Sequence, residues 1–358
     1  MEEASDSDQL AIDYRRSAIR KTAFIIAGAA LLMLSICFSV TLGTHSISLE
    51  QAASAIWDKI AGTTYEPGST EWWNSYVVWE ERMPRAFAAI FAGASLAVVG
   101  AAMQAMLRNP LADPYTTGIS SGAMVGVSAG IVLGLTLPFL GDELALMANA
   151  FITGIIPALV IVGITKMKNV SPTTVILAGL ALSFMFGALT QIIMMGAEAE
   201  KSQEVYKWMV GTLSYVVSDK IPLMATITVA GSVFFIIVSK QLNLISMGDE
   251  GAKSLGLDTE KFRNLCLLVM SVMIAEQVSV TGVLGFVGLV VPHMARMIVG
   301  VDNRILIPSS MILGALLVLV SDILARTLLD GISVGVVLSF IGGPMFLIFI
   351  LRQRRDMW

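Results

Sequence analysis

Apolar runs of about twenty residues, nearly free of charged side chains, recur along almost the whole chain. A helix rises about 1.5 Å per residue, so each run is long enough to cross the roughly 30 Å of hydrocarbon in a bilayer. The sequence therefore predicts an all-α membrane protein with ten transmembrane helices. We place them at 22–43, 86–107, 118–138, 146–165, 173–195, 221–239, 264–282, 283–300, 305–325 and 332–351, with a break at Thr281-Gly282.

Composition leads to the same class of protein. Of the 358 residues, 56% are hydrophobic and 14% are charged, and the mean hydropathy is +0.78. A soluble domain cannot bury so much apolar surface, so we expect membrane lipid to surround the chain. Nucleic acid is not an expected partner. The first apolar run is too long for the core of a signal peptide and no small-residue cleavage site follows it, which favours a retained helix.

An even number of spans places both termini on one side of the membrane. That side holds 16 of the 23 basic residues, so the positive-inside rule makes it cytoplasmic. We therefore expect a protein of the cytoplasmic membrane. It has a cytoplasmic N-terminal segment at 1–21, a transmembrane domain at 22–351 and a cytoplasmic C-terminal tail at 352–358.

The order of the spans indicates an inverted repeat. Predicted helices 2 to 5 begin outside the cell and helices 7 to 10 begin inside, as in transporters built from two opposed halves. The segments ADPYTTGISSGA and RILIPSSMILGA both run from Pro through Ser-Ser to Gly-Ala, a faint echo between the halves. In helix 2, small residues at four-residue spacing predict the close approach of another helix, at Ala89, Gly93, Ala97 and Ala101.

Three segments between or beside the spans are dense in residues with special backbone roles. In RMPRAFAAIFAG, Pro84 predicts the first turn of helix 2 at the outer surface, and in RNPLADP the two prolines predict a cytoplasmic turn. The segment SMGDEGAKSLGLDTEKFR predicts one or two amphipathic helical turns in a cytoplasmic loop at about 240–263. The third segment begins TGVLGFVGLVVPHMAR and leads to SDILAR and IGGPMF.

These motifs resemble the permease subunits of the iron-chelate and cobalamin ABC importer family (FecCD-type, type II). RMPR, RNPLADP, GISSGA, MGDEGAKSLGL, GFVGLVVPHMAR, SDILAR and IGGPMF occur in the family's order and at compatible spacing over essentially the whole chain. The resemblance implies a homodimer of ten-helix subunits with two cytoplasmic ATPase subunits and an extracytoplasmic substrate-binding protein. It also implies import of a metal chelate, such as an iron-siderophore, haem or cobalamin, without indicating which.

The resemblance also assigns roles to particular residues. It places the docking site for the binding protein at Arg82, Arg85 and Arg326, two of which would gain from a helix N-terminus if Pro84 opens helix 2. It places the ATPase contact at Asp249, Glu250, Gly251, Lys253, Leu255 and Gly256. There we expect Leu255 to fill an apolar pocket and the glycines to permit close turns. It places the cytoplasmic gate at Asn109, Pro110, Leu111, Thr173 and Thr174.

The residues predict no chemistry carried out by the chain itself. GDEGAKS lacks the direct Gly-Lys-Ser/Thr succession of a phosphate-binding loop, so we expect no ATP hydrolysis and no cofactor here, with ATP and Mg used by the partner ATPase. Cys37 and Cys266 lie in apolar runs, where a thiol behaves as a small hydrophobe, and predict neither a disulfide nor a metal site. For His293 a structural role and a ligand role both stay open.

The predicted spans contain almost no ionisable residue, which favours an energy source outside this chain. The exception is Glu276, for which two alternatives are open: a water-accessible position near the helix end, or a residue that lines the transport path. Gly343 and Pro344 are further path-lining candidates, in a helix that is either broken or simply kinked. The alternative functions are an ion-coupled secondary transporter that uses Glu276 and, less favoured, a membrane-embedded transferase.

Overall fold

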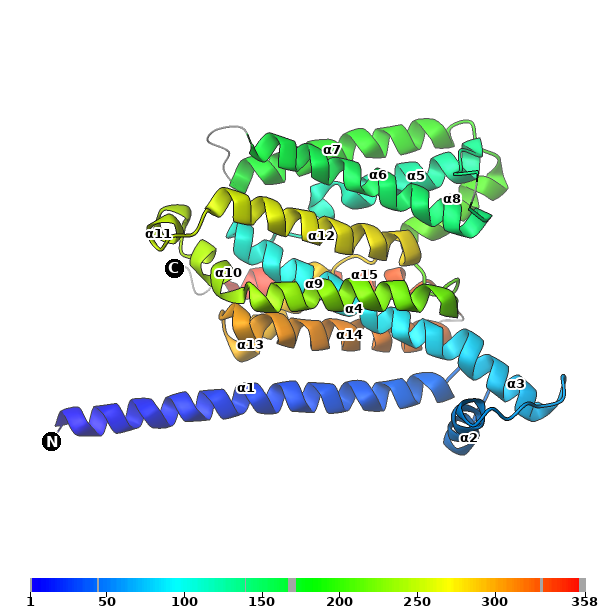
Figure 1. Cartoon of the computed structure of the whole chain (residues 1–358), viewed down its shortest axis with the longest axis horizontal. Coiled ribbons are helices and arrows are strands. Elements are labelled where there is room, and N and C mark those ends of the chain that lie inside the picture. The colour runs from blue at the N-terminus through cyan, green and yellow to red at the C-terminus, as the bar shows by residue number, and fades with distance from the viewer. Residues whose placement is uncertain (1, 44, 139, 167–171, 329–330, 354–358) are drawn as a thin grey trace.

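The computed structural model describes residues 2–43, 45–138, 140–166, 172–328 and 331–353, and every regular element in them is helical. The long helices lie side by side in Figure 1, so the bundle has two ends. We call one the α11 end, where α11 (Asp249–Ser254) and the start of α1 (Glu2–Thr41) lie. The other is the α2 end, where α2 (Leu49–Ile60) and α3 (Thr70–Tyr76) lie.

Each predicted span has a helical counterpart among the described residues. Besides α1 these are α4 (Met83–Leu107), α5 (Ile119–Leu133), α6 (Asp142–Thr165), α7 (Pro172–Met194), α9 (Ile221–Ile237), α12 (Thr259–Thr281), α13 (Val287–Val299), α14 (Asn303–Thr327) and α15 (Val334–Gln353). Seven described helical stretches are long and apolar enough to cross a membrane, and α5, α13 and α15 contain shorter apolar helices. The all-helical membrane class is therefore confirmed.

Helix boundaries follow the glycines and prolines. The predicted break at Thr281-Gly282 is confirmed, because α12 ends at Thr281 and Gly282 has a φ of 68°. Gly134, also at 68°, ends α5 before the predicted residue 138. At the N-terminus the helix begins at Glu2 instead of residue 22, because residues 2–21 contain neither Pro nor Gly to end it. Of the predicted tail, residues 354–358 lie outside the described residues.

Several short helices were not expected from the sequence. The stretch before α4 is helical, since α3 continues through a π-helical turn, η1 (Val77–Arg82), into α4. α2 has a capping box in which Ser48 and Gln51 exchange hydrogen bonds. The others are η2 (Pro114–Thr117), α8 (Ala199–Val210) and η3 (Ser218–Lys220). They are too short or too polar for the membrane pattern to reveal.

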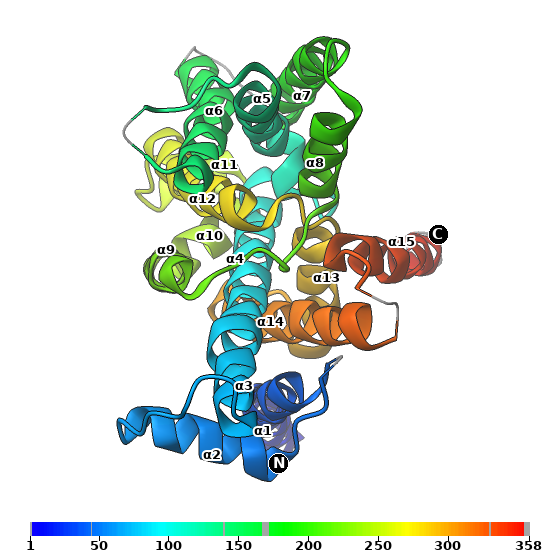
Figure 2. The same cartoon turned by 90° about the vertical axis from the view of Figure 1, so that its right-hand side faces the viewer.

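α4 forms the centre of the bundle, where Figure 2 shows it running between α9 and α12 on one side and α13 and α14 on the other. The predicted close approach is confirmed at Gly93. An ideal Cβ there would overlap the carbonyl of Gly314 in α14, and a Cβ at Gly314 would overlap the carbonyl of Gly93 and the side chain of Ala97. The two backbones are thus in direct contact, which only small residues allow.

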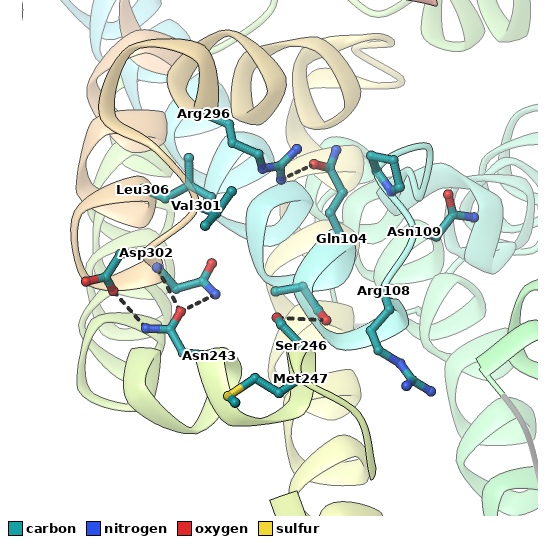
Figure 3. A pocket seen from close by; sticks show the side chains of 13 residues that line it. Gln104, Arg108, Asn109, Asn243, Ser246, Met247, Arg296, Val301, Asp302 and Leu306 are labelled. Atoms are coloured by element: carbon teal, nitrogen blue, oxygen red, sulfur yellow. Dashed lines mark hydrogen bonds between the residues drawn. The ribbon is translucent and has the colours of Figure 1, made fainter. Parts of the chain in front are cut away.

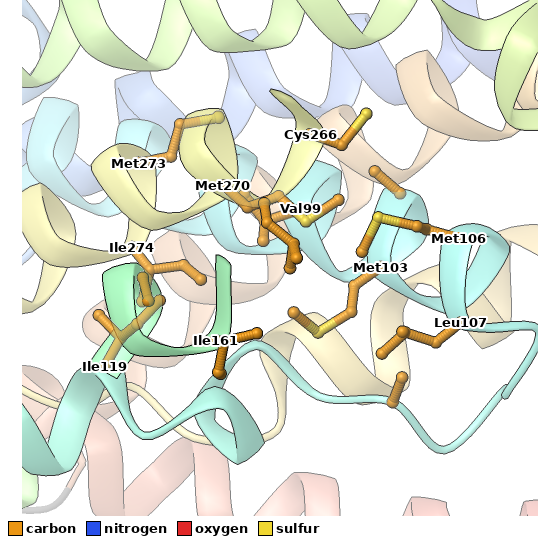
Figure 4. Packing of buried hydrophobic residues seen from close by; sticks show 14 of the residues in the cluster. Val99, Met103, Met106, Leu107, Ile119, Ile161, Cys266, Met270, Met273 and Ile274 are labelled. Atoms are coloured by element: carbon orange, nitrogen blue, oxygen red, sulfur yellow. The ribbon is translucent and has the colours of Figure 1, made fainter. Parts of the chain in front are cut away.

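Methionines fill much of the core between α4 and α12. Figure 4 shows Met103 and Met106 from α4 beside Met270 and Met273 from α12, all of them fully buried. Cys266 lies among them, also buried, as expected for a thiol that acts as a small hydrophobe. Unbranched thioether side chains adapt to the irregular space between the two helices.

Candidate functional site

Two short helices at the α11 end form the predicted cytoplasmic loop. α10 (Ser239–Ser246) begins just after α9, and α11 begins after Gly248, whose φ of 117° lies in the region that favours glycine. Gly256, with a φ of 85°, turns the chain toward α12. The expected amphipathic turns are confirmed. The close turn expected at Gly251 is wrong, because this residue lies inside α11, whereas its contact with an ATPase stays a prediction.

Asp249 attaches α11 to the bundle. Its two carboxylate oxygens each accept a hydrogen bond of 3.1 Å from Nη2 of Arg263, and Arg108 at the end of α4 lies 3.7 Å away. Asp258 fixes the start of α12, since it accepts from the Lys261 N–H and pairs with the Lys261 ammonium at 3.0 Å. These hydrogen bonds lower the pKa of Asp258. The segment between the two aspartates is therefore held at both ends.

Residues 247–256, which overlap this segment, present apolar side chains to solvent. Met247 is 77% exposed and Leu255 is 64% exposed, whereas Ala252 is buried against the bundle. Glu250 and Lys253 are exposed beside them. Apolar side chains held in water at fixed positions, with charged neighbours, are typical of a surface that a partner covers. We call residues 247–256 the coupling segment.

The predicted gate turn lies next to the coupling segment. Arg108 ends α4 with a φ of 50°, and the Asn109 side chain accepts a hydrogen bond of 2.9 Å from the Leu111 N–H. This turn leaves Leu111 half exposed. A pocket of about 590 Å³ separates the turn from α10, and Figure 3 shows Arg296 pointing across it to Gln104, with a hydrogen bond of 2.8 Å.

The remaining gate and path residues lie on other helices. Thr173 and Thr174 are exposed in the first turn of α7, at the same end of the bundle, and residues 167–171 before them lie outside the described residues. α15 runs unbroken through Pro344, so the alternative of a broken helix is wrong. A Cβ on Gly343 would meet open space. The gate and path roles of these residues stay predictions.

Two of the three predicted docking arginines bind the end of α1. Arg82 is buried, and its guanidinium donates to the carbonyls of Val40 and Thr41 at 2.7 and 2.8 Å. Arg326 donates to the carbonyl of Ser39 at 2.7 Å. The last carbonyls of a helix have no partner within the helix, so these two arginines cap α1 from η1 and α14.

Asp322 joins the third arginine to this group. The carboxylate is fully buried and accepts a hydrogen bond of 2.7 Å from Nε of Arg85, with Nε of Arg326 at 3.5 Å. The expected helix N-terminus beside the arginines is wrong. Residues Val77–Arg82 continue the helix upstream, and the Met83 N–H donates to the Val78 carbonyl. No free helix end is therefore present there to attract a carboxylate.

Glu276 lies inside the protein. Glu276 is 1% exposed, so in this structure it neither has the water-accessible position near the helix end nor lines an open path. Gln277 donates to one carboxylate oxygen at 2.6 Å and to Thr228 of α9 at 3.3 Å. The other Glu276 oxygen has no hydrogen-bond partner. Burial of a polar pair at this contact ties α12 to α9.

The sequence leaves His293 open as a structural residue or a ligand, and its surroundings can be compared with what a metal site needs. His293 packs on Phe349, with ring centroids 4.6 Å apart, which is a structural contact between α13 and α15. Among the described residues, no group of three or more His, Cys, Asp or Glu side chains is arranged to hold a metal ion.

Several membrane-length helices around a tightly packed central helix, with a fixed amphipathic segment at one end, define a multi-pass membrane protein. Residues 31–352 match the FecCD transport family, and the chain belongs to this family of ABC transporter permeases.

Relatives and a solved structure cover most of the chain. The hemin transport system permease protein HmuU of Yersinia pestis is 36% identical over 77% of this chain and 83% of its own length. The cobalamin import system permease protein BtuC of Halobacterium salinarum is 30% identical over 95% of this chain and 98% of its own length. A metal-chelate type ABC transporter solved in an inward-facing conformation matches with a TM-score of 0.80 at 26% identity, over 92% of this chain and 99% of that one.

Proposed function

We propose that this chain is the membrane subunit of an importer that moves a metal chelate inward across the cytoplasmic membrane, powered by a separate ATPase. Two copies would form the path, each with ten spans in an inverted repeat and both termini in the cytoplasm. Two ATPase subunits would bind the α11 end, and a substrate-binding protein would dock at the α2 end. The family membership and the cargo named for the hemin and cobalamin relatives support this proposal.

The coupling segment is the observation that carries the proposal. Met247 and Leu255 are exposed, yet α11 is attached to the bundle through Asp249 and Arg263 and lies beside the gate turn through Arg108. A force applied to such a segment is transmitted to the end of α4, because salt bridges and a buried helix face connect them. An ATPase that binds there could therefore move the gate turn without contacting it.

Changing Leu255 to Asp tests this assignment. A carboxylate in an apolar contact loses its hydration without gaining a partner, so the ATPase should no longer co-purify with the permease, and chelate uptake should stop. Leu135→Asp is the matched control, since Leu135 is about as exposed as Leu255 but lies just after the end of α5, beside α8 and away from the coupling segment. Normal ATPase binding by the Leu255→Asp variant, in a permease that inserts and folds normally, would disprove the contact.

The predicted docking arginines already bind acceptors within the chain, so a binding protein would have to compete with these acceptors. Arg82 and Arg326 bind carbonyls of α1, and Arg85 binds Asp322. Only part of the Arg85 side chain reaches solvent. We propose that Arg85 makes the first contact with carboxylates of the binding protein, and that Arg82 and Arg326 hold the surface in shape.

A further inference from the structure

A pocket near the α2 end is lined largely by methionine. It lies between α5, α7 and α8 and has a volume of about 460 Å³. The described residues that line it are Ser121, Met124, Gly187, Thr190, Gln191, Met194, Met195, Tyr206 and Met209. Four of these nine are methionines, and we call the site the methionine pocket. It is distinct from the coupling segment and from the arginine group, by which we mean Arg82, Arg85 and Arg326 with Asp322.

The pocket has a buried wall and an open mouth. Met124 and Thr190 are buried, and the Thr190 hydroxyl donates to the Phe186 carbonyl of its own helix at 3.1 Å, so the Thr190 hydroxyl already has an acceptor. Met195 and Tyr206 are mostly exposed at the mouth. The side chains that a ligand would meet first are therefore a thioether and an aromatic ring.

The lining selects the chemistry of a ligand. The nine described lining residues include no charged side chain, so an oxyanion or a hydrated cation would lose its water without compensation. Thioethers are polarisable and unbranched, and they adapt to large apolar surfaces. An apolar cavity of this size with a few polar groups at fixed points is typical of a site for an organic ligand.

The mouth of the pocket favours a ligand that comes from water over a lipid tail. α8, which supplies Tyr206 and Met209, is a polar helix with charges at Glu200, Lys201, Glu204 and Lys207. Lys201 donates to the carbonyl of Val132 at the end of α5, which holds α8 across that end of the pocket. Charged side chains are costly within the acyl region, so a helix with four of them marks the aqueous boundary beside the pocket.

We propose that the methionine pocket receives the flat apolar face of a tetrapyrrole metal chelate. This inference rests on the proposed function and specifies its cargo. Such a ring has two apolar faces and carries its polar groups at the edge, where Gln191 and Ser121 can bind them. A hydroxamate siderophore presents an oxygen-rich shell instead, and the pocket offers few donors for it. The thioethers act by packing against the ring and not by binding its metal.

The test uses the full chain in nanodiscs, titrated with hemin in the absence of any binding protein. Binding is followed by the shift of the hemin absorbance band, and empty nanodiscs correct for partition into lipid. The double variant Met194→Leu, Met209→Leu keeps the apolar surface and should bind within about threefold of the wild type. The double variant Met194→Gln, Met209→Gln should bind about tenfold more weakly, because amides are buried without partners.

Three controls define the outcome. Met185→Gln changes an exposed methionine of α7 outside the pocket and should have no effect. Metal-free protoporphyrin should bind as well as hemin, and a ferric hydroxamate should not compete. Equal hemin affinity in the wild type and the Gln variant would overturn the proposal. So would competition by the hydroxamate, or a loss in the Leu variant as large as in the Gln variant, which would indicate metal ligation.

Uptake assays separate this inference from the function on which it rests. With the ATPase and the binding protein reconstituted, the Gln variant should import hemin more slowly than the wild type at equal ATPase binding. Normal import by the Gln variant would remove the methionine pocket from the path but leave the proposed function intact. If the wild type imports no chelate at all, the proposed function itself fails.

Discussion

At the residue scale, buried charges hold the α2 end together. Asp322 has no exposed surface, and it is the shared acidic partner of Arg85 and Arg326. Arg326 also donates to the Ser39 carbonyl of α1. Buried ion pairs contribute little compared with an apolar replacement, but the loss of one partner leaves the others buried and uncompensated. The arginines are therefore part of the fold whether or not a binding protein is present.

Replacing Asp322 with Ala should lower the free energy of unfolding by about 3–5 kcal/mol, because Arg326 stays buried without its carboxylate. The measurement is thermal unfolding of the purified chain in detergent. Asp258→Asn, which breaks an exposed pair with Lys261, should leave the midpoint almost unchanged. A midpoint equal to the wild type in Asp322→Ala would show that the carboxylate does not hold the arginines.

The sequence identified the arginines but not what they bind. Arg85 and Asp322 lie 237 residues apart, and the carbonyls that accept from Arg82 and Arg326 belong to a third helix. No spacing rule connects such positions, because the pairing arises only when α1, α4 and α14 pack. At the α11 end, the local sequence was enough to predict the local structure. There the charges and glycines of one short segment predicted exposed amphipathic turns, although the tether from Asp249 to Arg263 was missed.

At the scale of elements, the contact of α4 with α14 depends on glycine. Gly93→Ala should force the two backbones apart, at a cost of roughly 1–3 kcal/mol, because the new methyl group would overlap the Gly314 carbonyl. Gly163→Ala is a matched control on α6, where a Cβ would meet nothing within 4 Å. That change should be neutral or slightly stabilising, since Ala favours helix. Equal thermal midpoints for the two variants would contradict the direct backbone contact.

Element positions were predictable where hydrophobic length decided them. All predicted spans have helical counterparts, and glycines mark several of the ends correctly. The hydrophobic pattern did not predict α2, α3 and α8. These helices are short and partly polar, so they contain no apolar run of membrane length. The sequence also did not predict that the chain is already helical before Pro84. Proline does start α4, but the π-helical turn before it keeps the helix continuous with α3.

At the scale of the molecule, the two ends differ in the way an importer requires. The α11 end presents a fixed segment with exposed Met247 and Leu255, next to the turn that ends α4. The α2 end carries the arginine group and the methionine pocket. Much of α7 is uncovered, with only 17% of its apolar window buried, which leaves a broad face for lipid or for a second copy.

Reconstituted uptake tests the central claim most directly. The chain is placed in proteoliposomes with its ATPase and binding protein, and accumulation of the metal chelate is measured with ATP on the ATPase side. The account predicts uptake that requires ATP, the ATPase and Leu255, and that persists when proton and sodium gradients are collapsed. Uptake by the chain alone, driven by an ion gradient and lost in Glu276→Gln, would instead identify an ion-coupled carrier and contradict the account.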